Sequence, residues 1–126
     1  MRKAYSKKGD SGFTLDCSGR RLAKDHPRII LGGKIDALQS ALDLALLGAR
    51  GPAQAVLREA RSRLWGEVDP RDLKRLEGFI DSLGEPPRHF VRFGSVQAVR
   101  YNECRVRCRD LESACTPLLR AGRMRP

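Results

Sequence analysis

Residues 34–50 read KIDALQSALDLALLGAR, and this stretch decides the fold class. Its apolar side chains recur every three or four positions, which is the period of one helix face. That face consists of Ile35, Leu38, Leu42, Ala45 and Ala49, with Leu46 on its flank. Gly51-Pro52 follows and marks a break. The spacing therefore predicts a helix over residues 34–50 that buries one side.

Three later segments have the same character. Residues 52–65 begin with a proline that suits the first turn of a helix. A third helix is predicted to begin at Pro70, with Asp69 as its N-cap, and to end at Gly84. A last helix is predicted from Val96 toward Thr116, where Pro117 kinks or ends it. The inward residues predicted for the second and third helices are Val56, Leu57, Ala60, Leu64, Leu73, Leu76, Phe79, Ile80 and Leu83.

These elements predict an all-α protein, an up-and-down helical bundle of four to five helices. Residues 1–33 carry five glycines among Ser, Asp and Lys, so we expect a long N-terminal loop there. A length of 126 residues fits a single domain. We accordingly divide the domain into a loop segment, residues 1–33, and a bundle, residues 34–126.

The charge is strongly basic: 25 Lys and Arg against 15 Asp and Glu give a formal net charge of +10. Arginine supplies 19 of the basic residues, and its planar guanidinium pairs with two phosphate oxygens at once. The surplus favours an anionic partner, although an arginine-rich solvated surface has the same composition. No zinc-finger, basic-zipper or aromatic RNA-binding motif accompanies the charge, so a nucleic-acid partner is not expected.

No apolar stretch reaches the roughly 18 residues of a membrane span, and the basic start lacks the apolar core of a signal peptide. We therefore expect a cytoplasmic protein. The cysteines form no C-x-x-C pair, which argues against a structural zinc site. Cys104, Cys108 and Cys115 share one stripe of the last predicted helix, which favours core packing over a thiol-ligand or redox role.

Two places carry groups suited to chemistry. The first is the stretch SKKGDSGFT, residues 6–14, where glycines allow an anion to approach the backbone N–H groups and Lys, Ser and Thr add donors. An ordinary flexible terminus has the same composition, and the order of a Walker A loop is absent. The phosphate-binding candidates in this stretch are Ser6, Lys7, Gly9, Asp10, Gly12 and Thr14.

The second place is the last helix. Asn102, Arg105, Arg109 and Glu112 lie within about 80° of one another on it, beside the cysteine stripe. Glu112 can brace Arg109 at i, i+3. Such polar groups line a cleft or form a surface face of ion pairs, and the pattern alone leaves both open.

Five ordered blocks match motifs of one known family. Residues 6–14 correspond to T-K-T-G-D-x-G-x-T, and residues 21–28, RLAKDHPR, correspond to R-V-x-K-D-D-P-R. Residues 33–40, GKIDALQS, are similar to G-T-V-D-E-L-N-S. Residues 90–95, FVRFGS, resemble F-V-L-P-G-G-S with one residue lost, and residues 104–113, CRVRCRDLES, resemble A-R-x-x-C-R-R-A-E-R. Over nearly its whole length the chain therefore resembles the PduO-type ATP:cob(I)alamin adenosyltransferases.

This resemblance implies a homotrimer of mainly five-helix bundles that binds ATP in a cleft between subunits. It implies that a reduced corrinoid, cobalamin or a relative in the Co(I) state, attacks the 5′ carbon of ATP and that triphosphate leaves. By motif position the triphosphate and its Mg, held through the phosphates rather than by protein ligands, would lie against Lys7, Gly9, Asp10, Gly12, Thr14 and Lys24. Asn102 and Glu112, on the face of the last helix that carries Arg105 and Arg109, are further ATP-binding candidates.

The remaining family roles fall on five other residues. Arg28 would be a further polyphosphate contact, and Arg105 and Arg109 would neutralise the phosphate charge as the bond breaks. Asp36 would pair with Arg105 across helices. Phe90 would close the lower face of the corrin.

The departures from the motifs leave a second function open. Ala37 replaces an acidic residue. Asp110 and Ser113 replace arginines, and these two changes lower the positive charge expected beside a triphosphate. Lys8 and Lys34, both in place of threonine, add charge back. The alternative is a non-catalytic relative that binds ATP or a corrinoid as a sensor, carrier or partner subunit. A basic module for nucleic acid or another acidic partner is the third reading.

Overall fold

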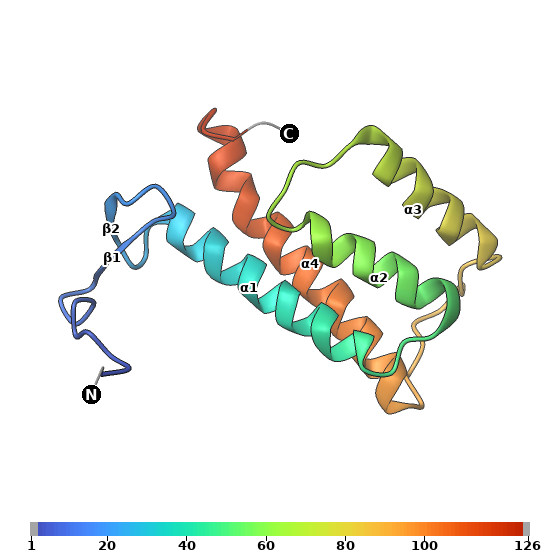
Figure 1. Cartoon of the computed structure of the whole chain (residues 1–126). Coiled ribbons are helices and arrows are strands. Elements are labelled where there is room, and N and C mark those ends of the chain that lie inside the picture. The colour runs from blue at the N-terminus through green and yellow to red at the C-terminus, as the bar shows by residue number, and fades with distance from the viewer. Residues whose placement is uncertain (1–2, 125–126) are drawn as a thin grey trace. The chain divides into compact units, whose positions relative to one another are not determined.

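The computed structural model describes residues 3–124. In this part of the chain a short hairpin precedes four helices (Figure 1). The strands are β1 (Phe13–Leu15) and β2 (Arg21–Ala23), and the helices are α1 (Pro27–Leu46), α2 (Gly51–Arg63), α3 (Pro70–Ser82) and α4 (Val96–Arg120). The predicted helical class is confirmed.

The described residues form two compact units. Residues 3–36 and 109–124 make one, here called the terminal unit, and residues 37–108 make the other, here called the central unit. The hairpin lies in the terminal unit, and α2 and α3 lie in the central unit, whereas α1 and α4 contribute residues to both.

The predicted long N-terminal loop, residues 1–33, contains a short hairpin that was not predicted from the sequence. β1 and β2 pair antiparallel, with Thr14 opposite Leu22. The turn between them is held by Asp16, whose Oδ1 accepts hydrogen bonds from the backbone N–H groups of Ser18 and Arg20, both at 2.9 Å. Gly19 has a φ of +79°, which glycine adopts without steric cost. The Asp16 carboxylate thus stabilises the turn of a strand pair that has no long alternating hydrophobic pattern in its sequence.

These hydrogen bonds also set the charge state of the turn. The Ser18 hydroxyl and the Arg20 backbone N–H donate to the Asp16 carboxylate and lower its pKa from 3.8 to about 2.

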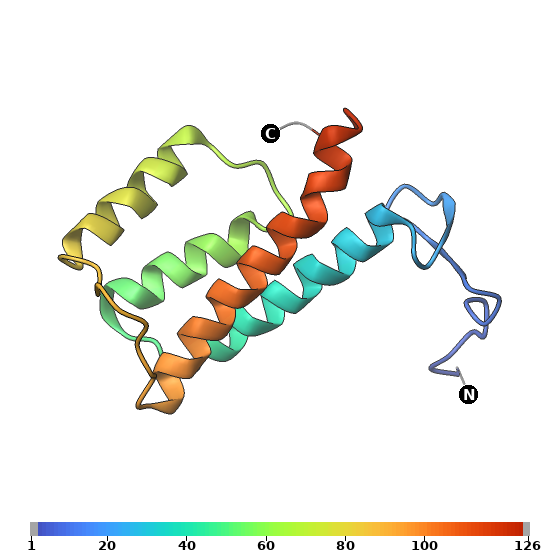
Figure 2. The same cartoon turned by 180° about the vertical axis from the view of Figure 1, so that it is seen from behind.

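The first helix starts seven residues earlier than predicted. Pro27 occupies its first position, and the side-chain Nδ1 of His26 accepts a hydrogen bond from the Arg28 backbone N–H at 3.2 Å. Gly32 and Gly33 were counted in the predicted loop, but they lie inside this helix. Figure 2 shows α1 as one continuous helix. A glycine costs about 1 kcal/mol in a helix, which a capped first turn can offset.

The core prediction for this helix is confirmed, while its predicted end at Arg50 is wrong. The buried apolar side chains of the central unit include Leu38, Ala41, Leu42, Ala45, Ala49 and Cys104. The helix ends at Leu46, where Gln97 Nε2 donates to the Ala45 carbonyl at 2.7 Å. A Cβ at Gly48 would meet the side-chain amide of Gln97, which would have to shift to accommodate it.

The start of α3 is confirmed, and its buried face is not. Asp69 caps the helix and forms a capping box with Asp72. The apolar residues expected to point inward, however, are exposed: Leu73, Leu76, Ile80 and Leu83. Asp72 is the buried residue of this helix instead, because ion pairs with α2 satisfy its carboxylate. The sequence periodicity thus identified the apolar face of α3, but it did not show whether another part of the chain covers that face.

The last helix runs past its predicted end. Pro117 lies inside α4, which continues to Arg120, and the Pro117 carbonyl still accepts from the Ala121 N–H at 3.1 Å. The core prediction for the cysteines is confirmed for Cys104, whose burial raises its thiol pKa. Cys108 is exposed, so the stripe is only partly buried. None of the helices in residues 3–124 is long and apolar enough to cross a membrane.

Candidate functional site

The N-terminal loop folds into two successive turns. Asp10 N–H donates to the Lys7 carbonyl and Gly12 N–H donates to the Gly9 carbonyl, both at 3.2 Å. Lys7 has a φ of 58° and Gly12 a φ of +83°, both in the left-handed region. The loop is therefore shaped by its own backbone rather than by a core.

Lys24 reaches back across this loop. Its backbone N–H donates to the Gly12 carbonyl at 2.9 Å, which ties the end of β2 to the second turn. Its ammonium lies over Gly9, because a Cβ built on Gly9 would be 3.1 Å from Lys24 Nζ. The structure thus brings together three residues that the sequence assigned to one site.

A surface hollow of about 420 Å³ lies beside these turns. Three predicted residues line it, namely Ser6, Gly9 and Thr14. Two cationic residues that were not among the predicted site residues line it as well: Lys8, and Arg21, whose guanidinium lies 4.2 Å from the centre of the Phe13 ring. Arg21 opens the motif block of residues 21–28, which is the signal that could have revealed it.

The cations of this loop are not committed to carboxylates. Within residues 3–124, no ion pair involves Lys7, Lys8 or Lys24. Asp10 and Arg28 are exposed at the loop and at the start of α1. Ammonium groups and backbone N–H groups exposed together are suited to bind an anion.

Of the four predicted residues of the last helix, two lie in the central unit. Arg105 Nε donates to Asn102 Oδ1 at 2.9 Å, which fixes the guanidinium along the helix. Both residues line a hollow of about 290 Å³ together with Phe93 and Tyr101. Phe93 and Tyr101 were not predicted as site residues, although Phe93 stands at a departure from the family motif.

The other two residues, Arg109 and Glu112, lie in the terminal unit and are exposed. No ion pair joins Arg109 to Glu112 in the described residues, so the predicted brace is absent from this structure. Next to Arg109, Asp110 Oδ2 accepts from Lys34 Nζ at 2.7 Å, although the two are 76 positions apart. Asp36 is exposed on α1, and its pairing with Arg105 of the other unit stays a prediction.

Phe90 is fully exposed on the segment between α3 and α4. It lines an open hollow of about 650 Å³ with Pro87, Arg88 and His89. A fully solvated aromatic ring has apolar surface that a planar apolar ligand can cover. Its role against a corrin stays a prediction.

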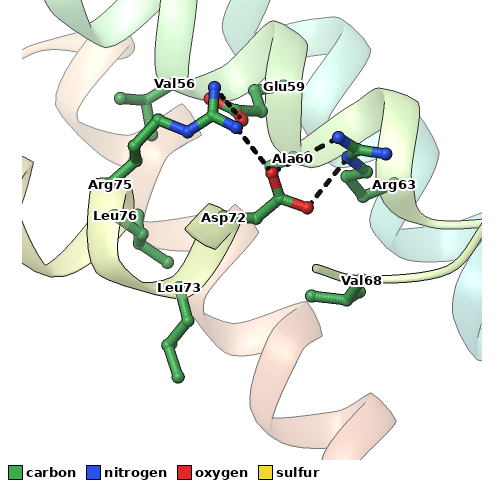
Figure 3. Close-up of a pocket in the computed structure, with 9 residues that line it drawn as sticks. All are labelled: Val56, Glu59, Ala60, Arg63, Val68, Asp72, Leu73, Arg75 and Leu76. Carbon is green, nitrogen blue, oxygen red and sulfur yellow. Dashed lines mark hydrogen bonds and ion pairs between the residues drawn. The ribbon is translucent and has the colours of Figure 1, made fainter. Parts of the chain in front are cut away.

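A further pocket, of about 200 Å³, lies between α2 and α3 (Figure 3). Its charged groups are paired with one another: Asp72 contacts Arg63 at 3.1 Å and Arg75 at 3.0 Å, and Arg75 contacts Glu59 at 3.1 Å. Figure 3 shows the two guanidinium groups approaching the Asp72 carboxylate from opposite sides. The Asp69 backbone N–H, which donates to the Asp72 carboxylate, lowers the Asp72 pKa, and the charges of Arg63 and Arg75 lower it further.

The described residues contain no group of three or more His, Cys, Asp and Glu placed to hold a metal ion. The polar side chains that line the hollow beside the N-terminal loop are hydroxyls and cations, which suit phosphate oxygens.

Comparison with known proteins agrees with this chemistry. The family model for cobalamin adenosyltransferase matches residues 4–125. The chain is 38% identical to the corrinoid adenosyltransferase PduO of Citrobacter freundii over 55 residues, which are 44% of this chain and 16% of that protein. It is also 38% identical to the corrinoid adenosyltransferase PduO of Salmonella typhimurium (strain LT2) over 56 residues, 44% of this chain and 17% of that protein. The matched segment thus spans about a sixth of those relatives.

Two solved structures share the fold. They are variants of a PduO-type ATP:corrinoid adenosyltransferase from Lactobacillus reuteri, each complexed with cobalamin and ATP. One has a TM-score of 0.72 and the other 0.68, both at 22% identity; the likeness covers 94% of this chain and 76% or 78% of theirs. Together with the family model, which spans nearly all of the sequence, they lead to one conclusion: the chain belongs to the cobalamin adenosyltransferase family.

Proposed function

We propose that this protein is an ATP:corrinoid adenosyltransferase. It transfers the 5′-deoxyadenosyl group of ATP to the Co(I) of cobalamin or a related corrinoid and releases triphosphate. The observation that carries the proposal is the N-terminal loop, where Lys24 lies over Gly9 and the cationic side chains of Lys8 and Arg21 line a hollow. The relatives named as corrinoid adenosyltransferases, and the neighbours complexed with cobalamin and ATP, support the same chemistry.

The loop serves the leaving group. Triphosphate carries several negative charges that grow as the C–O bond breaks, so preorganised donors lower the barrier. Lys7 and Lys24 supply ammonium groups, and Gly9 and Gly12 allow the phosphate oxygens close to the backbone. Ser6 and Thr14 add hydroxyls, Asp10 and Arg28 complete the polar shell, and Mg enters bound to the ATP phosphates.

The last helix supplies the remaining charge. Arg105 and Arg109 neutralise the phosphates in the transition state, and Asn102 orients Arg105 through its 2.9 Å hydrogen bond. Asp36 holds Arg105 from α1, and Glu112 lies one turn from Arg109 as a polar partner of the ligand.

The corrinoid lies against Phe90. An aromatic ring there covers the lower corrin face, excludes water from a strongly reducing centre, and offers no axial ligand to the cobalt. The Co(I) reactant and the unpaired cysteines fit a reducing compartment, so the cytoplasm remains the predicted location.

We propose a homotrimer with the site between subunits. The exposed apolar face of α3 and the small core of the single chain support association, because such surface is stabilised when another chain covers it. Light scattering coupled to gel filtration tests the assembly: three times the chain mass is expected, and a monomer that turns over ATP contradicts it.

The test of function is anaerobic incubation with ATP and chemically reduced cobalamin. The expected result is the absorbance change of Co–C bond formation, with one triphosphate released per adenosylcobalamin formed. A folded protein that binds ATP but forms no Co–C bond overturns the proposal.

A non-catalytic relative is the second candidate, and Asp110 and Ser113 favour it because they replace motif arginines. Such a protein binds ATP or corrinoid without turnover. The assay above separates the two, because only the transferase releases triphosphate.

A further inference from the structure

The ion pair between Lys34 and Asp110 has no role in the function proposed above. It joins the first half of α1 to the second half of α4 within the terminal unit, with Lys34 Nζ 2.7 Å from Asp110 Oδ2. Their side chains are 36% and 37% exposed, so the pair is neither buried nor fully solvated. Both residues are among the departures from the family motifs.

The position of Asp110 makes this pair consequential. Asp110 directly follows Arg109, and an unpaired carboxylate there would offset the Arg109 charge toward a polyanion within the Debye length of about 10 Å. Paired with the Lys34 ammonium, the carboxylate is compensated. The local charge that a phosphate meets is then that of Arg109.

We propose that Lys34 is a positioning residue for polyphosphate binding: by holding the Asp110 carboxylate, it keeps the Arg109 end of α4 cationic. The proposal rests on the proposed function, because it assumes that Arg109 meets the triphosphate. Lys34 acts through Asp110 and does not itself contact the substrate.

The experiment compares Lys34→Met with Asp110→Asn, using inorganic triphosphate as the probe in calorimetric titrations. Both variants remove the same ion pair, so both lower the melting temperature. The dissociation constants move in opposite directions: Lys34→Met weakens binding by about two- to fivefold, and Asp110→Asn tightens it by a similar factor. A merely structural pair shifts both constants in the same direction, and that result overturns the proposal.

The charge-reversed double variant Lys34→Asp/Asp110→Lys restores a pair. Its melting temperature is expected to return toward that of the wild type, and its triphosphate affinity to equal or exceed the wild-type value, since the carboxylate then lies on α1. No recovery of the melting temperature contradicts the pairing.

A matched control lies on the same helix. Arg107 Nε and Glu103 Oε1 are also 2.7 Å apart, with both side chains 42% exposed. Arg107→Met and Glu103→Gln change charge in the same way, and we expect neither to alter triphosphate affinity. If Arg107→Met weakened triphosphate binding and Glu103→Gln tightened it by the same factors as the Lys34 and Asp110 variants, the effect would be general electrostatics, and the specific role of Lys34 would be overturned.

The titration needs no corrinoid, so the two proposals fail separately. Opposite shifts without Co–C bond formation support the Lys34 role and contradict the transferase. Normal adenosyl transfer with unchanged triphosphate affinity in both variants overturns the Lys34 role alone. A wild-type protein that binds no triphosphate overturns both.

Discussion

Two cation-rich regions of this molecule treat their charge differently. Between α2 and α3, Arg63 and Arg75 are paired with Asp72 and Glu59, and the cluster satisfies itself. In the N-terminal loop, no ion pair within the described residues involves Lys7, Lys8 or Lys24. A paired arginine stabilises the fold, whereas an uncommitted lysine beside a glycine turn is available to an anionic ligand. Net charge alone does not distinguish these two uses.

Arg109→Ala gives the largest expected effect. If Arg109 stabilises the departing triphosphate, its removal lowers adenosyl transfer by at least about 100-fold, as the loss of one preorganised charge does elsewhere. Initial rates of Co–C bond formation measure it. Arg107→Ala is the matched control, because Arg107 is paired with Glu103, and equal losses in both variants would mean that any arginine of α4 serves.

Lys24→Ala comes next and sharpens the comparison directly. Removing the ammonium that lies over Gly9 should weaken ATP binding about tenfold, the value of one charge-assisted hydrogen bond, while the melting temperature changes little. Calorimetric titration with ATP measures the affinity. Arg71→Ala, which removes a cation already paired with Asp69, should leave ATP affinity unaltered; a loss there would undo the distinction between the regions.

Asp72→Asn is expected to show the reverse pattern. It removes a buried carboxylate that holds two guanidinium groups and the α3 capping box, so the melting temperature falls. ATP affinity should stay within the error of the titration, because the cluster belongs to the α2–α3 contact. A clear loss of ATP binding in a folded Asp72→Asn protein would place the cluster in the site.

Lowering the pH should decrease the stability of both the N-terminal hairpin and the α2–α3 cluster, by less than the substitutions above. The pKa of Asp16 is about 2 in the folded chain and 3.8 without its partners, and the pKa values of Asp69 and Asp72 are also lowered. A lowered folded-state pKa contributes stability above the unfolded value and loses it as the pH falls, here between about 4 and 2. Melting temperatures across that range measure the loss, and Asp16→Asn should make it shallower. Stability that rises toward pH 2 would refute the assignment.

The helices were largely predictable because their signals are local. Apolar periodicity located α1, and Asp69-Pro70 located the start of α3. The hairpin escaped prediction because the carboxylate of Asp16, rather than an alternating apolar pattern, holds its turn. The buried face of α3 escaped because burial there depends on ion pairs with α2.

The candidate site also has parts that local motifs predicted and parts that depend on contacts between distant residues. Motif positions predicted that Gly9, Gly12 and Lys24 act together, and backbone turns bring them together. The Lys34–Asp110 pair could not be predicted, because its members lie 76 positions apart and neither has a motif signal for the other. Arg21 was overlooked because its place beside Phe13 depends on the strand pairing.

The central claim is that the N-terminal loop and the end of α4 serve one triphosphate. Titration of inorganic triphosphate into the wild type, Lys24→Ala and Arg109→Ala tests it most directly. We predict one class of site in the wild type and a raised dissociation constant in each variant, since each lacks one cation of the same site. A dissociation constant that Arg109→Ala leaves unchanged, while Lys24→Ala raises it, would contradict the claim.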